Sequence, residues 1–131
     1  MIAIDTSSLV AYLCGASGDD VDVVSKALDQ RQAVLPPVVL TEMLSDPKLP
    51  SDARAALLDL PLLDPAPGYW ERAGALRSVI LSKGRKARVA DALIAQSCVD
   101  ASVPLVTRDR DFRHFARLAG LVLLSRGAPV R

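Results

Sequence analysis

Short apolar runs alternate with longer amphipathic segments along the chain, which is the pattern of strands that alternate with helices. Brief apolar runs predict strands at residues 1–5, 33–35, 105–106 and 121–124. Segments with helical spacing predict helices after residues 5 and 19, from residues 37 and 51, and over residues 69–82 and 89–100. Strands separated by helices pair in parallel and are covered on both faces. The pattern therefore predicts a three-layer α/β/α fold with a mainly parallel central sheet of four to five short strands.

The length of 131 residues predicts one domain over residues 1–131, because no repeat or long linker divides the chain. Such a chain buries roughly two thirds of the surface that it exposes when unfolded. Its apolar stretches are far shorter than the roughly 20 residues that span a bilayer. No basic segment followed by an apolar one precedes the first strand. We therefore expect a cytoplasmic protein with no membrane contact.

The charges nearly cancel, with 16 Lys and Arg against 15 Asp and Glu and a formal net charge of +1. Such a balance excludes a protein that binds nucleic acid by bulk electrostatic attraction. Aromatic residues make up only 4%, which disfavours a single-strand binder that stacks bases. Cys14 and Cys98 have no ligand-like spacing, so neither a zinc site nor a disulfide framework is expected. Any contact with nucleic acid must therefore be local.

Acidic residues stand where an α/β sheet binds ligands, at the carboxyl ends of its strands. Asp5 and Asp109 follow predicted strands, Asp91 lies near the start of an apolar helix, and Glu42 lies within another helix. If these ends face one crevice, four carboxylates converge and raise one another's pKa unless a cation lies between them. Oxygen ligands without Cys or His favour Mg²⁺ or Mn²⁺, as one or two ions.

Each acid also has an ordinary structural explanation. Asp5 can cap the first helix, and Asp91 can interact with the dipole of its own helix. Glu42 can reach solvent from a half-buried helix. Asp109 and Asp111 can belong to a solvated turn of alternating charges. Only the combination of these acids predicts a site.

Four segments in chain order carry a resemblance to a known family. They are Asp5-Thr6-Ser7, Glu42 on its helix, VADALIA at residues 89–95 and LVTRDRDF at residues 105–112. Together they resemble the PIN-domain family, most closely the VapC toxins of bacterial toxin–antitoxin systems. Members of this family are metal-dependent ribonucleases, so the resemblance implies an endoribonuclease toxin with a hydrolase activity on RNA. It also implies an acidic catalytic and metal-binding site formed by Asp5, Glu42, Asp91 and Asp109.

The chemistry suggests a role for each residue of this site. Hydrolysis of a phosphodiester needs a nucleophile made from water and neutralisation of the charge that develops on the phosphoryl group, which divalent metals supply. Asp5 and Asp91 are expected as the principal ligands and Asp109 as the third, while Glu42 orients or deprotonates the water or holds a second ion. The resemblance leaves either Asp109 or Asp111 as the fourth acid.

Hydroxyl groups and basic residues surround these acids in the sequence. Ser7 and Thr107 are expected to support the site by donating hydrogen bonds to a carboxylate or phosphate. Asp111 is expected to lie next to the metal ligands and to support them too. Both hydroxyl residues are also common in helix caps and turns. Seven of the 16 basic residues flank Asp91 and Asp109: Lys83, Arg85, Lys86, Arg88, Arg108, Arg110 and Arg113. We predict that five of them contact RNA phosphates: Arg85, Lys86, Arg88, Arg108 and Arg110. The alternative is a solvated loop and helix face.

The apolar content predicts that another chain covers part of the surface. Half of the residues are hydrophobic, and the mean hydropathy is +0.26. The resemblance implies a homodimer and an antitoxin protein whose segment lies in a groove near the site. Six residues are candidates for such surfaces or for the core: Leu9, Tyr12, Leu13, Leu44, Leu57 and Leu58.

Two other function classes remain open at this point. In an α/β phosphoryl-transfer protein or phosphatase, Asp5 would be the covalent nucleophile. Dehalogenase-type phosphatases, however, have a second Asp where this chain has Ser7, and receiver domains need an adjacent acid pair that is absent. The other class is an inactive PIN-like binding module. Retention of four acids argues against it, because burying a charge costs several kcal/mol.

Overall fold

The computed structural model describes residues 1–125 and 128–130. In chain order, the elements are β1 (Ile2–Ile4), α1 (Thr6–Leu13), α2 (Asp19–Asp29), β2 (Ala33–Val34), α3 (Pro37–Leu44), α4 (Ser51–Leu58), α5 (Tyr69–Ser82), α6 (Val89–Ala101), β3 (Leu105–Val106), α7 (Phe112–Ala119), β4 (Leu123–Ser125) and β5 (Ala128–Val130). None of the helices in the described part of the chain combines the length and the apolar character needed to cross a membrane.

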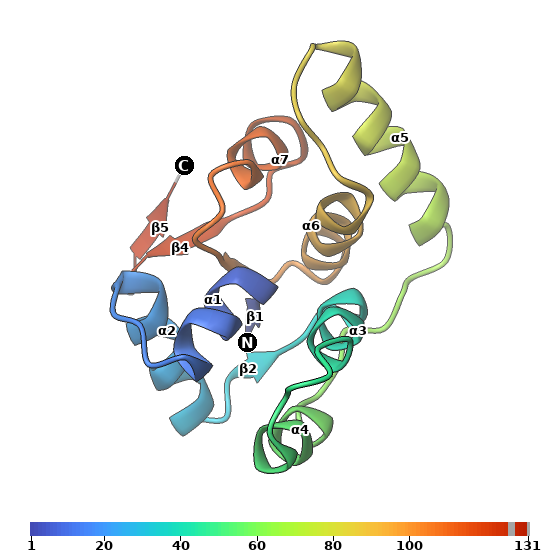
Figure 1. The fold of residues 1–131 in the computed structure, drawn as a ribbon. Helices are drawn as coiled ribbons and strands as arrows, with labels where there is room; N and C mark the ends of the chain where they lie inside the picture. The colour runs from blue at the N-terminus through green and yellow to red at the C-terminus, as the bar shows by residue number, and fades with distance from the viewer. Residues whose placement is uncertain (126–127, 131) are drawn as a thin grey trace.

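The strands form one sheet in the order β2-β1-β3-β4-β5. The first four are parallel, and β5 pairs antiparallel with β4. Figure 1 shows α1 and α2 on one side of this sheet and α3, α5, α6 and α7 on the other. This arrangement confirms the predicted three-layer α/β/α fold with a mainly parallel sheet.

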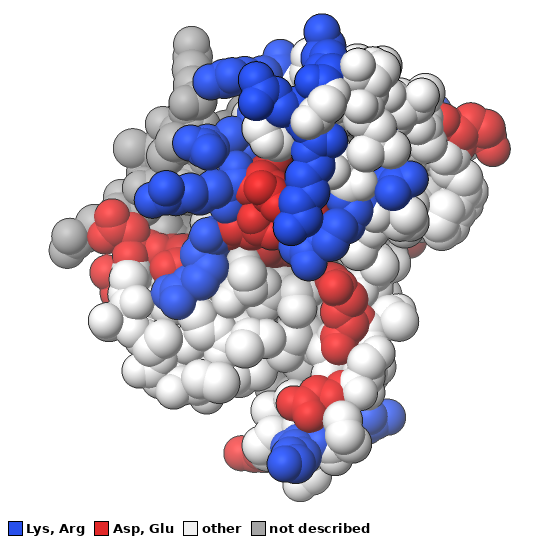
Figure 2. Space-filling model, turned by 45° about the horizontal axis from the view of Figure 1, so that its top comes forward, with Lys and Arg blue, Asp and Glu red and all other residues white. Residues whose placement is uncertain are grey.

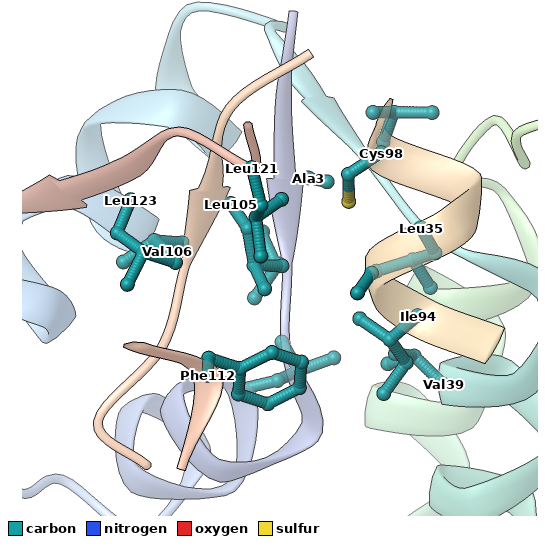
Figure 3. Packing of buried hydrophobic residues seen from close by; sticks show 14 of the residues in the cluster. Ala3, Leu35, Val39, Ile94, Cys98, Leu105, Val106, Phe112, Leu121 and Leu123 are labelled. Carbon is teal, nitrogen blue, oxygen red and sulfur yellow. The ribbon is translucent and has the colours of Figure 1, made fainter. Parts of the chain in front are cut away.

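The core covers both faces of the sheet, with α6 packed on one face and Leu9, Val24 and Ala27 of α1 and α2 on the other. Leu105 and Val106 of β3 are both fully buried but point to opposite faces of the sheet. Val106 lies beside Leu123 on one side of the strand, whereas Leu105 points towards Ile94 and Cys98 of α6 on the other (Figure 3). Phe112 of α7 completes this layer. Most residues of α6 are buried, including Asp91 in its first turn. The packing of α6 against the sheet therefore places Asp91 at the edge of the core.

Most predicted elements are present, and the differences lie at their ends. Pro37 begins α3 and α5 covers residues 69–82, as predicted. The last predicted strand, at 121–124, is instead β4 at Leu123–Ser125, because Gly120 ends α7 in a left-handed conformation and Leu121 packs into the core. Neither α7 as a separate helix nor β5 is predicted by the sequence pattern. Asp19 and Ser51, which the sequence suggests as helix caps, are instead the first residues of α2 and α4, whose N-caps are Gly18 and Pro50.

Candidate active site

Asp5 lies directly after β1, where its backbone N–H donates to the carbonyl of Val106 in β3 at 3.0 Å. Its side chain is buried, and Oδ2 accepts hydrogen bonds from Ser7 Oγ at 2.6 Å and Thr107 Oγ1 at 2.7 Å. The same oxygen caps α1 by accepting weakly from the N–H of Ser7 at 3.4 Å. Asp5 therefore caps the helix through one carboxylate oxygen, and the other oxygen, Oδ1, has no hydrogen bond among the described residues.

The loop after β3 brings Asp109 towards Asp5. The N–H of Asp109 donates to Thr107 Oγ1 at 3.0 Å, and the N–H of Asp111 donates to Asp109 Oδ1 at 2.9 Å. These two turns fix the loop without using Asp109 Oδ2. The carboxylate of Asp111 lies 3.8 Å from Lys86 Nζ, so it faces the basic loop before α6.

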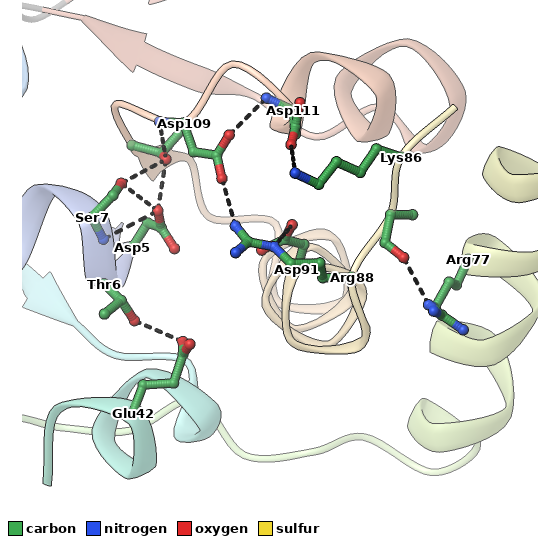
Figure 4. A network of polar contacts seen from close by, with 12 residues as sticks. Asp5, Thr6, Ser7, Glu42, Arg77, Lys86, Arg88, Asp91, Asp109 and Asp111 are labelled. Atoms are coloured by element: carbon green, nitrogen blue, oxygen red, sulfur yellow. Dashed lines mark hydrogen bonds and ion pairs between the residues drawn. The ribbon is translucent and has the colours of Figure 1, made fainter. Parts of the chain in front are cut away.

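Asp91 approaches the same place from the first turn of α6 and is only 5% exposed. Burial raises its pKa, and the charges of Asp109 and Asp5 raise it further, whereas Arg88 opposes the rise. Arg88 Nε lies 3.3 Å from Asp91 Oδ2, and Arg88 Nη2 lies 3.0 Å from Asp109 Oδ2. Figure 4 shows the three acids around this guanidinium. The three carboxylates are thus close enough to interact electrostatically.

Glu42 reaches the rim of this cluster from α3. Its Oε1 accepts a hydrogen bond from Thr6 Oγ1 at 2.7 Å, next to Asp5 in the chain (Figure 4). Unlike the other three acids, Glu42 is exposed. The structure therefore brings together Asp5, Asp91 and Asp109, with Glu42 beside them at the solvent edge.

The family model for the PIN domain matches residues 2–118. The chain belongs to the PIN domain family. No curated protein sequence shows significant similarity to it.

Solved structures share the fold of this PIN domain. A chain of VapBC2 from Rickettsia felis, bound to a promoter DNA fragment, has a TM-score of 0.66 at 20% identity, covering 95% of this chain and 98% of that chain. A chain of VapBC-5 from Mycobacterium tuberculosis has a TM-score of 0.63 at 23% identity, covering 94% and 96%. A chain of a toxin–antitoxin complex from Klebsiella pneumoniae has a TM-score of 0.67 at 21% identity, covering 93% and 96%.

The acids of this PIN domain offer oxygen ligands alone, the donor set that suits Mg²⁺ or Mn²⁺. Among the residues that the structure describes, no three Asp, Glu, His or Cys side chains lie close enough to hold one metal ion. The guanidinium of Arg88 connects Asp91 and Asp109 instead. The donor chemistry therefore fits a divalent metal, whereas the carboxylates are not closed around one in this conformation.

Basic side chains surround the acidic centre of the PIN domain, as Figure 2 shows for this face. Arg85, Lys86, Arg88 and Arg110 are exposed. Arg108 is placed differently, because its Nε and Nη2 donate to the two carboxylate oxygens of Asp20 at 2.8 and 2.9 Å. The guanidinium of Arg108 is therefore tied to α2.

Three contributors to the site escaped the sequence analysis. Asp20 fixes the guanidinium of Arg108 and accepts from Ser8 Oγ at 2.9 Å. Thr6 holds Glu42. Arg77 Nε donates to the carbonyl of Ala87 at 2.8 Å and so anchors the loop before α6. The polar turn at residues 15–20 indicated that this segment could make polar contacts. Arg108, the partner of Asp20 in this turn, lies 88 residues further along the chain, so the pair could not be predicted.

Proposed function

We propose that this PIN domain is a Mg²⁺- or Mn²⁺-dependent endoribonuclease and the toxin of a toxin–antitoxin pair. The observation that carries the proposal is the convergence of Asp5, Asp91 and Asp109 at the carboxyl ends of β1 and β3. Buried carboxylates that repel one another are retained at a cost, and a divalent cation relieves that cost. The surrounding basic rim supplies the attraction for a polyanion that the net charge does not.

The residues would divide the work of phosphodiester hydrolysis. Asp5, through Oδ1, together with Asp91 and Asp109 would hold the metal, which when bound neutralises charge on the phosphoryl group and makes water more acidic. Glu42, held by Thr6, orients or deprotonates the attacking water. Attack by water in line with the departing 3′ oxygen leaves a 5′-phosphate and a 3′-hydroxyl.

Supporting residues orient the acids rather than touch the phosphate. Ser7 and Thr107 both donate to Asp5 Oδ2 and fix the direction of its free oxygen. Asp111 pairs with Lys86 and joins the basic loop to the loop after β3.

The exposed side chains of Arg85, Lys86 and Arg110 would contact RNA phosphates on either side of the scissile bond. Arg88 would join them once its guanidinium leaves the acids. Arg108 would add only its longer-range charge, because Asp20 holds its guanidinium.

An antitoxin segment would occupy an apolar groove between α1, α2 and α4. This groove is lined by Leu9, Tyr12, Leu13, Leu28 and Leu57, among others. The proposal of an antitoxin is supported by the structural neighbours, which are toxin–antitoxin complexes. Leu13 is 41% exposed at the edge of the groove, so Leu13→Asp should abolish co-purification with the product of a short reading frame adjoining the coding region. Unchanged co-purification would place the antitoxin elsewhere.

The resemblance also implies a homodimer, which we retain as part of the proposal. Exposed apolar side chains such as Trp70 and Val79 on α5 provide surface for a second copy. Light scattering after size exclusion should give twice the mass of the chain.

The nuclease activity is tested by mapping RNA ends after brief expression of wild type, Asp91→Asn and Asp64→Asn. Wild type and Asp64→Asn should produce new 5′-phosphate ends, because Asp64 is an exposed acid outside the site. Asp91→Asn should reduce them by more than the roughly 10- to 100-fold that loss of an outer-shell partner costs a metal site. Equal cleavage by all three proteins would refute the assignment, and a phosphorylated Asp5 would favour a phosphoryl-transfer protein instead.

A further inference from the structure

Arg88 occupies the position between two of the acids that are expected to bind the metal. It is the N-cap residue of α6, but its side chain makes no capping hydrogen bond. Its Nε and Nη2 instead contact Asp91 Oδ2 and Asp109 Oδ2 at 3.3 and 3.0 Å. Among the basic residues that the structure describes, Arg88 is thus the one whose contacts reach both acids.

The surroundings of Arg88 fix its backbone, whereas the contacts found for its side chain among the described residues are those with Asp91 and Asp109. Its carbonyl accepts the N–H of Ala92 at 3.1 Å, which belongs to the first turn of α6. The preceding residue, Ala87, is buried, and its carbonyl is held by Arg77. The side chain of Arg88, in contrast, is 60% exposed, whereas that of Asp91 is 7% exposed. The guanidinium can therefore leave the acids through rotation of its own side chain.

We propose that Arg88 is an exchangeable counter-ion, which pairs with Asp91 and Asp109 when no metal is bound and rotates towards an RNA phosphate when a divalent cation enters. This inference rests on the proposed function. A guanidinium brings one charge to about 3.0 Å from a carboxylate oxygen. Mg²⁺ brings two charges to about 2.0–2.1 Å. A bound divalent cation therefore attracts each carboxylate more strongly than the guanidinium does, and the two groups cannot occupy the space between the carboxylates together.

The exchange also explains why the carboxylates are not closed around one centre in this conformation. A guanidinium is wide and planar, so it spans two carboxylates and holds them apart. Once released by the cation, Arg88 would lie next to the scissile phosphate of the RNA and bind its negative charge. One side chain thus keeps the metal-free site folded and later contributes to the binding of RNA.

Titration with Mg²⁺, followed by NMR of the arginine Nε–H groups, tests this exchange directly. The Nε–H signal of Arg88, assigned by its loss in Arg88→Lys, should shift as Mg²⁺ binds. The signal of Arg108 should stay, because its Nε–H is bound to Asp20 outside the cluster. Calorimetry on the same sample reports whether Mg²⁺ binds. Binding without movement of the Arg88 signal would overturn this inference alone, whereas absence of binding would overturn the proposed function and the inference with it.

Metal affinity of matched variants gives a second test that does not depend on RNA cleavage. Arg88→Gln should bind Mn²⁺ about tenfold more tightly than wild type, because no guanidinium competes; tenfold corresponds to roughly 1.4 kcal/mol. Without metal, Arg88→Gln should melt at a lower temperature than wild type. Addition of Mn²⁺ should raise the melting temperature of Arg88→Gln by more than that of wild type. Arg85→Gln removes the same charge from the same loop, and no contact of its side chain with an acid is found among the described residues. Equal effects of the two variants, or weaker binding by Arg88→Gln, would contradict the exchange.

Discussion

Asp5 is held by two hydroxyl groups that come from opposite ends of the chain. Ser7 lies two residues away, and Thr107 lies 102 residues away, yet both donate to the same oxygen. Thr107 also accepts the N–H of Asp109, so one hydroxyl joins two of the acids. The direction of the free oxygen of Asp5 therefore depends on the loop after β3.

Thr107→Val tests this joint role at the scale of one hydroxyl group. The variant keeps the shape of the side chain but loses the donor to Asp5 and the acceptor for Asp109. We expect a loss of about 1–3 kcal/mol of folding free energy and a weaker affinity for Mn²⁺. Urea unfolding and calorimetry measure the two effects. Thr107→Ser retains the hydroxyl and should behave like wild type; similar losses in both variants would mean that packing, not hydrogen bonding, is responsible.

The pKa of Asp20 gives a pH-dependent prediction. Hydrogen bonding from Arg108 lowers this pKa below its ordinary value, against the opposing effect of burial. Because the carboxylate is favoured in the folded state, its contribution to stability is present above about pH 4 and disappears as the pH falls through the folded-state pKa. Unfolding of wild type and Asp20→Asn should differ by about 1 kcal/mol at pH 7 and converge in acid. A difference that is the same at both pH values would exclude the ion pair as its source.

At the scale of elements, the turn between α1 and α2 acts as a support for the loop after β3. Gly18 has a φ of +146°, and an added Cβ would lie 2.7 Å from Asp20 Oδ1 and 3.1 Å from Arg108 Nη2. Arg108 also donates to the carbonyl of Ser17 at 3.2 Å. The absence of a side chain at Gly18 thus lets the ion pair close over the turn.

Gly18→Ala should destabilise the protein by about 1–3 kcal/mol, because it combines backbone strain with a clash against the ion pair. Gly74→Ala is the matched control. It lies in the exposed interior of α5, where an added Cβ meets nothing within 4 Å, and should stabilise by about 0.5–1 kcal/mol. Thermal unfolding of both variants measures the contrast. A small effect of Gly18→Ala on the free energy of unfolding would show that the turn can rearrange to accommodate the added Cβ.

At the scale of the whole molecule, a nearly neutral chain separates its charges on one face. Figure 2 shows acidic side chains gathered near the centre of this face, with basic side chains around them. The net charge of +1 gives no indication of this separation, because the two sets cancel in the sum.

Removal of two rim charges should change the salt dependence of RNA binding. Replacement of Arg85 and Lys86 by Gln should flatten the slope of log affinity against log salt by about 1.4 for a single strand, since each phosphate contact contributes about 0.7. The same pair of substitutions at Lys48 and Arg54, before and within α4, is the control. Fluorescence anisotropy with the inactive Asp91→Asn background measures both slopes. Equal slopes for the two double variants would mean that Arg85 and Lys86 do not contact RNA.

Local sequence patterns were enough to predict the layers of the fold and the four acids as candidates for a site. Apolar runs and helical spacing depend on local burial, so they predicted β1, α5 and α6 closely. Short-range patterns also placed Asp5 and Asp109 after strands. Helix caps and the bounds of β4 were less accurate, because neighbouring residues compete for those positions with little difference in free energy.

The way in which these residues face one another depends instead on contacts between segments that are distant in the sequence. The tertiary structure tied Arg108 to Asp20, joined Thr107 to Asp5, and put the guanidinium of Arg88 between Asp91 and Asp109. In the sequence, both arginines are equally plausible phosphate contacts. Their difference arises because a charged side chain takes its partner from whatever surface the packing of distant segments brings within about 3 Å, and no local pattern encodes that choice.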